Sequence, residues 1–243
     1  MSDTASGSDT RDRLLDQAED LFAQRGYHGV SIREITTAAN CNMASINYHF
    51  TNKKNLYLEV FRSRWVPREK RMLDEFLASL KGKKSPTPTE IITALAKAYL
   101  KGPFTDEEFR RHRQLIVREM YNPTEAFEEV AEKTLKPLFD VLYDLLKPFR
   151  HESAVGQGYL TFDIMSIFGI ILYLNYSRPM VSRITGKAYD DTFKTLLIDH
   201  MVRFSLNGLS VVDKSVDNPF FHIKPKTWIA SQKGGKKHVG DTI

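Results

Sequence analysis

Apolar residues recur along this chain at the three- and four-residue spacing of amphipathic helices, and no stretch is convincing as a β-strand. The first such stretch covers residues 10–25. One apolar stripe runs along it: Leu14, Leu15, Ala18, Leu21 and Phe22. Gly26 follows and is suited to end the helix, because glycine readily adopts the left-handed backbone found there. The pattern predicts an all-α fold.

Residues 31–50 have the pattern of two short helices joined by a tight corner. Ser31 can accept a hydrogen bond from a free N–H at the start of the first helix, and Glu34 can reach back to complete a capping box. Asn40 tolerates the left-handed backbone of a corner, and Asn42 can cap a second helix over residues 43–50. This spacing predicts a helix-turn-helix.

The two faces of this unit differ in chemistry. Ile35 and Ile46 are spaced to meet in the angle between the two helices. From residue 35 through 58 there is no Asp or Glu, while Lys53 and Lys54 are present. The outward positions of the second helix carry Met43, Ser45, Asn47, Tyr48 and His49. Such a surface suits a polyanion, and these side chains can contact base edges and phosphates.

The same periodicity predicts six further helices. They cover residues 53–80, 89–101, 106–121, 123–149, 154–177 and 189–206. Asn52 and Thr105 are expected to cap the first and third of them, and Asn122 with Pro123 the fourth. Pro67 should kink or divide the helix in which it falls, because proline lacks a backbone N–H.

The breaks between these helices predict the domain organisation. Residues 81–88 read as a linker, residues 178–187 as a connection, and Asn207-Gly208 as the cap of the last helix; Pro137 interrupts the fourth helix. The expected organisation is a disordered leader (1–9), a helix-turn-helix domain (10–52), an effector-binding and dimerisation domain (53–209) and a basic, partly disordered tail (210–243). The end of the tail has two open interpretations, a solvated disordered segment or a weak phosphate contact.

Composition excludes few functional classes, but it bears on the partners and the location of the protein. The formal charge of +5 and the pI of about 9.1 permit nucleic-acid binding without proving it. One cysteine excludes an intramolecular disulfide framework, and the polar N-terminus does not resemble a signal peptide, so a cytoplasmic location is expected. The most apolar segment, residues 159–176, contains polar residues and is shorter than the ~20 residues needed to cross a bilayer, so no membrane is expected.

The N-terminal residues resemble the TetR family of transcription regulators. The similarity runs from RLLDQAEDLFAQRGYHGVSI at residues 13–32, through Tyr-His-Phe at residues 48–50, to Lys53 and Leu56-Tyr57. This chain has Asn40-Cys41 where the family usually has Gly-Val, Thr36 where Ala is commoner, and Asn47 where Tyr is frequent. Residues 118–120 and 122–124 resemble, more loosely, the branch of the CecR regulator.

The resemblance implies a homodimeric repressor that binds a double-stranded DNA operator. We expect Met43, Ser45, Asn47 and Tyr48 to contact bases or their sugar-phosphate edges, and His49, Lys53 and Ser31 to hold phosphates. Ala44 lies on the same helix and belongs to the predicted surface. Asn47 is suited to adenine, and Lys53 at a helix N-terminus would be satisfied by a phosphate.

Residues 154–177 and 189–206 carry more apolar surface than packing against their own subunit requires. In the family this region forms a four-helix bundle between two subunits. A twofold dimer would place two recognition helices ~34–36 Å apart, so a palindromic operator is expected.

The resemblance also implies a small-molecule effector of unknown identity, bound within the C-terminal domain. The candidate contacts are aromatic or ionisable residues: Trp65, Tyr99, His112, Arg118, Glu119, Phe168 and Tyr173. Each also has a structural interpretation as a core or surface residue. For Arg118 and Glu119, the first pair to test, that interpretation is an ion pair.

Two other functional classes, an enzyme and a protein-interaction module, compete with a DNA-binding regulator. The chain lacks a Gly-rich phosphate loop, HExxH, a CxxC pair and a GxSxG elbow, and its seven histidines show no metal spacing. No catalytic residue, metal or cofactor is therefore predicted. The remaining alternative is a helical protein-interaction module that keeps the motif but has lost specific DNA binding.

Overall fold

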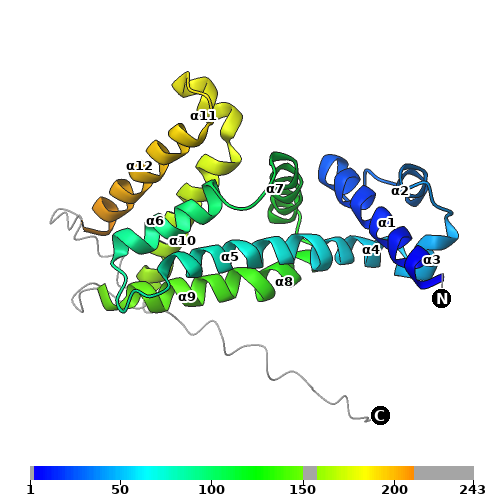
Figure 1. The fold of residues 1–243 in the computed structure, drawn as a ribbon, viewed down its shortest axis with the longest axis horizontal. Coiled ribbons are helices and arrows are strands. Elements are labelled where there is room, and N and C mark those ends of the chain that lie inside the picture. The colour runs from blue at the N-terminus through cyan, green and yellow to red at the C-terminus, as the bar shows by residue number, and fades with distance from the viewer. Residues whose placement is uncertain (1–2, 150–157, 211–243) are drawn as a thin grey trace, which may run out of the picture.

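The structure, a computed structural model, describes residues 3–149 and 158–210, and every regular element in these ranges is a helix. Figure 1 shows α1, α2 and α3 gathered at one end, which we call the head, and α5 to α12 forming the body, with α4 leading from one to the other. In chain order the α-helices are α1 (Asp3–Arg25), α2 (Ile32–Ala38), α3 (Ala44–Phe50), α4 (Lys53–Val60), α5 (Val66–Leu80), α6 (Pro88–Leu100), α7 (Asp106–Tyr121), α8 (Glu125–Val130), α9 (Lys136–Leu146), α10 (Gly158–Tyr176), α11 (Arg178–Thr185) and α12 (Asp191–Ser210). The all-α prediction is confirmed for the described residues.

The head is built from local signals. α1 begins at Asp3, so residues 3–9 of the predicted leader lie in the helix; it ends at Gly26, whose φ is 75° and whose N–H donates to the Phe22 carbonyl at 2.8 Å. Ser31 and Glu34 form the predicted capping box of α2. Asn40 occupies the left-handed region with φ of 51°, as the corner requires.

Two prolines lie inside long helical runs, and the helical backbone continues through both of them. The run that begins at α4 passes through a π-helical turn, Phe61–Trp65, before α5, and the Val66 N–H bonds to the Phe61 carbonyl five residues back. Pro67 then lies in the first turn of α5, where its missing N–H costs nothing. A second π-helical turn, Ala131–Leu135, precedes Pro137 in the same way between α8 and α9. At Pro67 and Pro137 the interruptions predicted from the sequence therefore take the form of π-helical turns, which are wider than α-helical turns.

Three predicted boundaries are wrong. Asn122 ends α7, and the next helix is capped by Thr124, whose hydroxyl accepts from the Ala126 N–H at 3.1 Å. The predicted connection at 178–187 contains α11, with Pro179 tolerated in its first turn and Gly186 ending it at φ of 68°. Asn207-Gly208 is no cap, because α12 continues to Ser210.

Buried apolar residues form two cores. One fills the body and joins α5, α6, α9, α10 and α12. The other fills the head but also includes α4, the first π-helical turn and parts of α7 and α8. The predicted domain boundary at residue 52 therefore falls inside a shared core, and the head is packed directly against α7.

Some predictions fall outside the described residues. These are the tail beyond Ser210 and residues 154–157 of a predicted dimer helix. Within the described ranges no one helix has the length and apolar content to cross a membrane; α10 and α11 pass that test only together, and they meet at an angle of 78°.

Candidate DNA-binding surface and its junction with the body

One side of α3 fixes it to the head. The side chains of Ile46 and Phe50 are 0% and 5% exposed, so they anchor the helix in the core. The Asn42 side chain accepts a hydrogen bond from the Ala44 N–H at 3.0 Å, which satisfies a free donor at the start of the helix. The predicted position of the cap is wrong by one residue, because the N-cap is Met43 and the helix begins at Ala44; Asn42, one residue earlier, still bonds to its first N–H.

The opposite side of α3 faces outward. We call Met43, Ala44, Ser45, Asn47, Tyr48 and His49 the recognition surface. Met43 is 56% and Tyr48 84% exposed, and Asn47 is exposed as well. In the described part of the chain, the side chains of Ser45, Asn47 and Tyr48 form no hydrogen bond to another protein group. Their donors and acceptors are free for a ligand.

Lys53 and Ser31 already have protein contacts. The Lys53 ammonium lies 4.3 Å from the ring centre of Tyr27, and burial lowers the pKa of this lysine from its ordinary value. The Ser31 hydroxyl donates to Glu34 at 2.7 Å within the capping box. A phosphate at Ser31 would therefore lie beside the Glu34 carboxylate. One at Lys53 would meet a partly desolvated cation, although the charge of Glu34 also acts on this lysine and raises its pKa.

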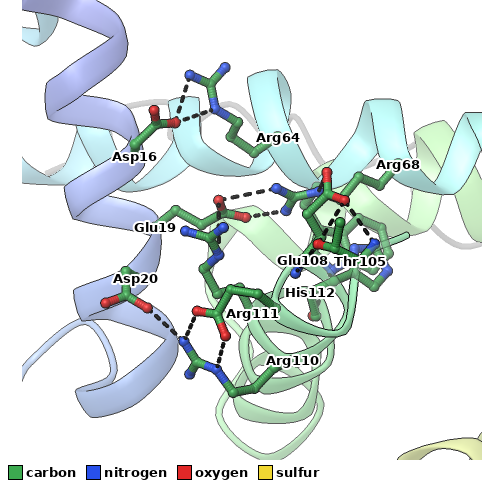
Figure 2. A network of polar contacts seen from close by, with 12 residues as sticks. Asp16, Glu19, Asp20, Arg64, Arg68, Thr105, Glu108, Arg110, Arg111 and His112 are labelled. Carbon is green, nitrogen blue, oxygen red and sulfur yellow. Dashed lines mark hydrogen bonds and ion pairs between the residues drawn. The ribbon is translucent and has the colours of Figure 1, made fainter. Parts of the chain in front are cut away.

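Charged side chains, several of them buried, join α1 to the body. We call the region where they meet, together with the contact between Tyr57 and Glu119, the junction. Glu19 on α1 is 1% exposed, and Arg68 on α5 donates two hydrogen bonds to it, one of 3.2 Å from Nη2 to Oε2. Figure 2 shows Arg111 of α7 reaching the same carboxylate; its Nε lies 3.8 Å away. Glu19 thus links α1 to both α5 and α7.

Arg118 and Glu119 of α7, predicted as effector contacts, instead bond to α1 and α4. Arg118 donates to the Ala23 and Gln24 carbonyls at the end of α1, at 3.1 and 2.6 Å. Glu119 is 1% exposed and accepts from the Tyr57 hydroxyl at 2.6 Å and from the Thr124 N–H at 2.8 Å. The two residues therefore serve separate contacts and do not pair with each other.

Four other predicted effector residues meet around Glu69 of α5. Tyr99 donates to this carboxylate at 2.9 Å, and the His112 ring lies 2.8 Å from it. Trp65 stacks on His112 with ring centres 4.4 Å apart, and Phe168 packs edge-on against Tyr99. Burial and the Glu69 carboxylate raise the pKa of Tyr99 well above 10.0, so its hydroxyl stays a neutral donor.

The space beside the Glu69 carboxylate is small. The cavity beside Glu69 and Tyr99 has a volume of about 10 Å³, which leaves no room for an organic ligand. Tyr173, the seventh predicted contact, is 55% exposed on the outer face of α10 and does not join the cluster. The structure thus brings four of the seven residues together, around a carboxylate that the sequence analysis missed.

Glu69 and Glu19 were missed for the same reason. Glu69 lies one helical turn from both Trp65 and Met72, and Glu19 one turn from Leu15 and Phe22, so each carboxylate sits on an apolar helix face. A charge in that position signals a buried partner. It does not say which residue the partner is.

Two family models match this chain. The model for bacterial regulatory proteins of the tetR family matches residues 14–60, and that for the C-terminal domain of the HTH-type transcriptional dual regulator CecR matches residues 88–209. The chain belongs to the TetR family. The members of this family are DNA-binding transcriptional regulators, not enzymes, and they usually act as dimers.

One relative supports the TetR assignment over a short stretch of the chain. The negative transcriptional regulator IcaR of the biofilm operon icaADBC in Staphylococcus aureus (strain Newman) is 38% identical over 47 residues, which cover 19% of this chain and 25% of IcaR. The chain therefore matches only about a quarter of that relative's length.

Solved structures extend the similarity to the TetR body. A TetR-family regulator from Bordetella parapertussis has a TM-score of 0.59 at 21% identity, covering 81% of this chain and 94% of that one. The fatty acid degradation regulator FadR from Bacillus halodurans has a TM-score of 0.58 at 21% identity, covering 83% and 96%. At these identities they show the shared fold alone.

Proposed function

We propose that this TetR-family chain is a homodimeric repressor, that α3 of each subunit enters a major groove of a palindromic operator, and that a small-molecule effector releases it. The observation that carries the proposal is the recognition surface. Its polar groups are free, the surrounding sequence is without carboxylates from residue 35 to 58, and Ile46 and Phe50 fix the helix beneath it. The relative IcaR is named as a negative regulator, which favours repression.

Each residue of the surface has a proposed role. Met43, Ser45, Asn47 and Tyr48 contact bases or sugar-phosphate edges, and Ala44 allows close approach. His49, Lys53 and Ser31 hold phosphates. Of these three, Lys53 is the strongest, since a phosphate would pair a cation that burial has already cut off from part of its water.

Exposed apolar residues support the homodimer. Five large apolar side chains on α10 and α12 are more than half exposed: Phe162, Met165, Tyr173, Leu196 and Phe204. A second copy packed on this face would bury them and complete a four-helix bundle. The twofold axis would then set the two α3 helices one DNA turn apart, ~34–36 Å.

The effector response is proposed to act through the helical run from Lys53 to Trp65, which connects head and body. A ligand releases DNA only to the extent that it prefers the form with wrongly spaced heads, typically ~1–3 kcal/mol or ~5–150-fold in operator affinity. A disulfide that locks α4 to the body should leave operator binding intact and abolish the response. An unchanged response would refute the role of this run.

The decisive experiment first selects, from random duplexes, the DNA sequences that the chain binds. It then compares the DNA binding of three variants, with the best of these sequences as the reference. Asn47→Ala should relax base preference at one position by ~1–3 kcal/mol. Lys53→Ala should weaken all sequences alike and reduce the salt slope by about one unit. Lys187→Ala, which removes an exposed charge between α11 and α12, is the matched control and should change neither.

Two outcomes would oppose the proposal. If Asn47→Ala leaves the site preference untouched, the readout assignment is wrong. Equal, weak binding to every duplex, in place of a preference of ~10³-fold or more, would instead favour the protein-interaction module.

A further inference from the structure

A second hollow lies beside α7, away from the Glu69 cluster. Its volume is about 560 Å³, and it opens where α10 ends and α11 begins. The side chains that decide its chemistry are Arg113, Gln114, Val117, Arg118, Tyr121 and Tyr176. The volume lies within the ~300–1,000 Å³ typical of small-molecule sites, whereas the cavity beside Glu69 does not.

The charge of this hollow is uncompensated. Two arginines line it and no Asp or Glu does. Across the described ranges, neither Arg113 nor Arg118 forms an ion pair: Arg113 donates to the Tyr176 carbonyl and Arg118 to carbonyls of α1. Glu119, the nearest carboxylate in sequence, already accepts from Tyr57 and Thr124. Two guanidinium groups without a carboxylate favour an anion.

Arg113 supplies an independent sign of a missing ligand. Its Nε is buried and has no hydrogen-bond partner within the described residues. A buried donor without an acceptor is costly, so a turn of this side chain that brings Nε to the hollow, where a ligand oxygen can accept from it, is favoured. An arginine presents its donors in a planar fork that matches a carboxylate or a phosphate. The apolar and aromatic side chains beside the two arginines favour an organic carboxylate.

Besides the arginines and the polar residues Gln114, Asn122 and Ser177, the lining consists of one apolar and two aromatic side chains. Val117 is half-buried one turn from Arg113 and next to Arg118, Tyr176 forms part of the wall, and Tyr121 stands 81% exposed at the rim. We propose that this hollow binds a small organic carboxylate with a ring or other apolar body, held by Arg113 and Arg118 with its apolar part against Val117 and the two tyrosines.

Arg118 connects this site to the head. Its guanidinium caps the last carbonyls of α1, and it lies so close to Gly26 that a Cβ there would be 3.2 Å from Nη1. A bound carboxylate draws on the same donors and therefore favours the form in which α1 is less firmly held. This step rests on the proposed repressor function; the binding site itself does not.

The first test measures binding without DNA. Naphthoate and its neutral analogue naphthamide are titrated into the full-length chain by calorimetry. The acid should bind at least about tenfold more tightly than the amide, since charge-assisted hydrogen bonds are the stronger ones. Arg113→Gln should abolish that preference, whereas Arg183→Gln, an exposed arginine of α11 outside the hollow, should preserve it.

A second variant guards against a folding defect in Arg113→Gln. Val117→Trp keeps both arginines but fills the hollow, and it should lower naphthoate affinity at least about tenfold. Equal affinity for acid and amide, full binding by both hollow variants, or no binding of naphthoate up to about 5 mM would each overturn the site.

The second test uses the selected operator. Naphthoate at saturation should weaken operator binding of the unmodified chain and leave that of Val117→Trp unchanged. Binding in the hollow with unaltered operator affinity would overturn the link through Arg118. Because the calorimetry contains no DNA, a chain that fails to bind any operator would refute the repressor function and leave the ligand result standing.

Discussion

The polar contacts that cap α2 and α3 join residues close together in the sequence, whereas those at the junction join residues far apart. Ser31 bonds to Glu34, and Asn42 to Ala44. At the junction Glu19 bonds to Arg68, and Tyr57 to Glu119. The first kind forms as soon as a helix forms; the second forms only when head and body come together.

The two regions also differ in burial. Tyr48 on the recognition surface is 84% exposed, while Glu19 and Glu119 at the junction are each 1% exposed. A buried charge that loses its partner is strongly destabilising, whereas an exposed side chain can be replaced at little cost. Substitutions on the recognition surface should therefore change DNA reading with little effect on stability, and substitutions at the junction should do the reverse.

Glu19→Ala should have the largest effect. It leaves the guanidinium of Arg68 buried, with Glu108 at 3.9 Å as its remaining carboxylate. We expect the free energy of unfolding to fall by about 3–5 kcal/mol. Urea denaturation followed by circular dichroism measures the change.

Asp16→Ala is the matched control on the same helix. Asp16 contacts Arg64 at 3.0 Å, but its side chain is 57% exposed, so the loss should stay within about 1 kcal/mol. Equal losses in the two variants would remove the distinction between buried and exposed pairs at the junction.

Tyr57→Phe should have the next largest effect. It removes the donor that meets Glu119 at 2.6 Å, and a hydrogen bond to a charged group contributes about 1.5–3 kcal/mol. Tyr48→Phe makes the same chemical change on the recognition surface and should stay within about 0.5 kcal/mol. If the two substitutions lower the free energy of unfolding by the same amount, the Tyr57 hydroxyl does not stabilise the junction.

Most helix ends could be predicted because their signals are local. Ser31 with Glu34, Asn52 and Thr105 each act within one helical turn, so residue type and spacing suffice. Errors arose where packing decides. Gly208 reads as a stop, but α12 continues past it, and Pro179 stands in the first turn of a helix that had been predicted as a connection.

The sites show the same limit. The composition of α3 predicts its outward face, because the anchors Ile46 and Phe50 are one turn apart. Nothing local indicates that Glu69 meets His112, or that Arg118 reaches the end of α1, since these contacts span 43 and about 94 residues of chain. Such partners depend on how α1, α5 and α7 pack.

Asn40→Ala tests how much one exposed residue with a left-handed backbone contributes to the stability of the head. An alanine in the left-handed conformation at φ of 51° costs about 1–2 kcal/mol, although Asn40 is exposed. Asn40→Gly should restore or exceed the original stability, because glycine adopts this backbone freely. Thermal denaturation of the two variants tests this, and an alanine variant as stable as the glycine one would contradict it.

The smallest effect concerns the capping box of α2. Hydrogen bonds from the Ser31 side chain and backbone, followed by one from Arg25, lower the pKa of Glu34 from 4.5 to about 2. Because the pKa is lower in the folded chain, the ionised carboxylate stabilises the head above pH 4.5, and this contribution is lost as the pH falls from 4.5 to about 2. Ser31→Ala removes the largest cause and should return the pKa of Glu34 toward 4.5.

The body contains a matched capping box at the start of α6. The pKa of Glu90 is also lowered to about 2, but the largest cause there is the hydrogen bond from Lys83, ahead of those from Thr87. Thr87→Ala should therefore raise the pKa of Glu90 less than Ser31→Ala raises that of Glu34. NMR titration of both carboxyl groups measures the two shifts, and a larger shift at Glu90 would show that the serine does not dominate the cap of α2.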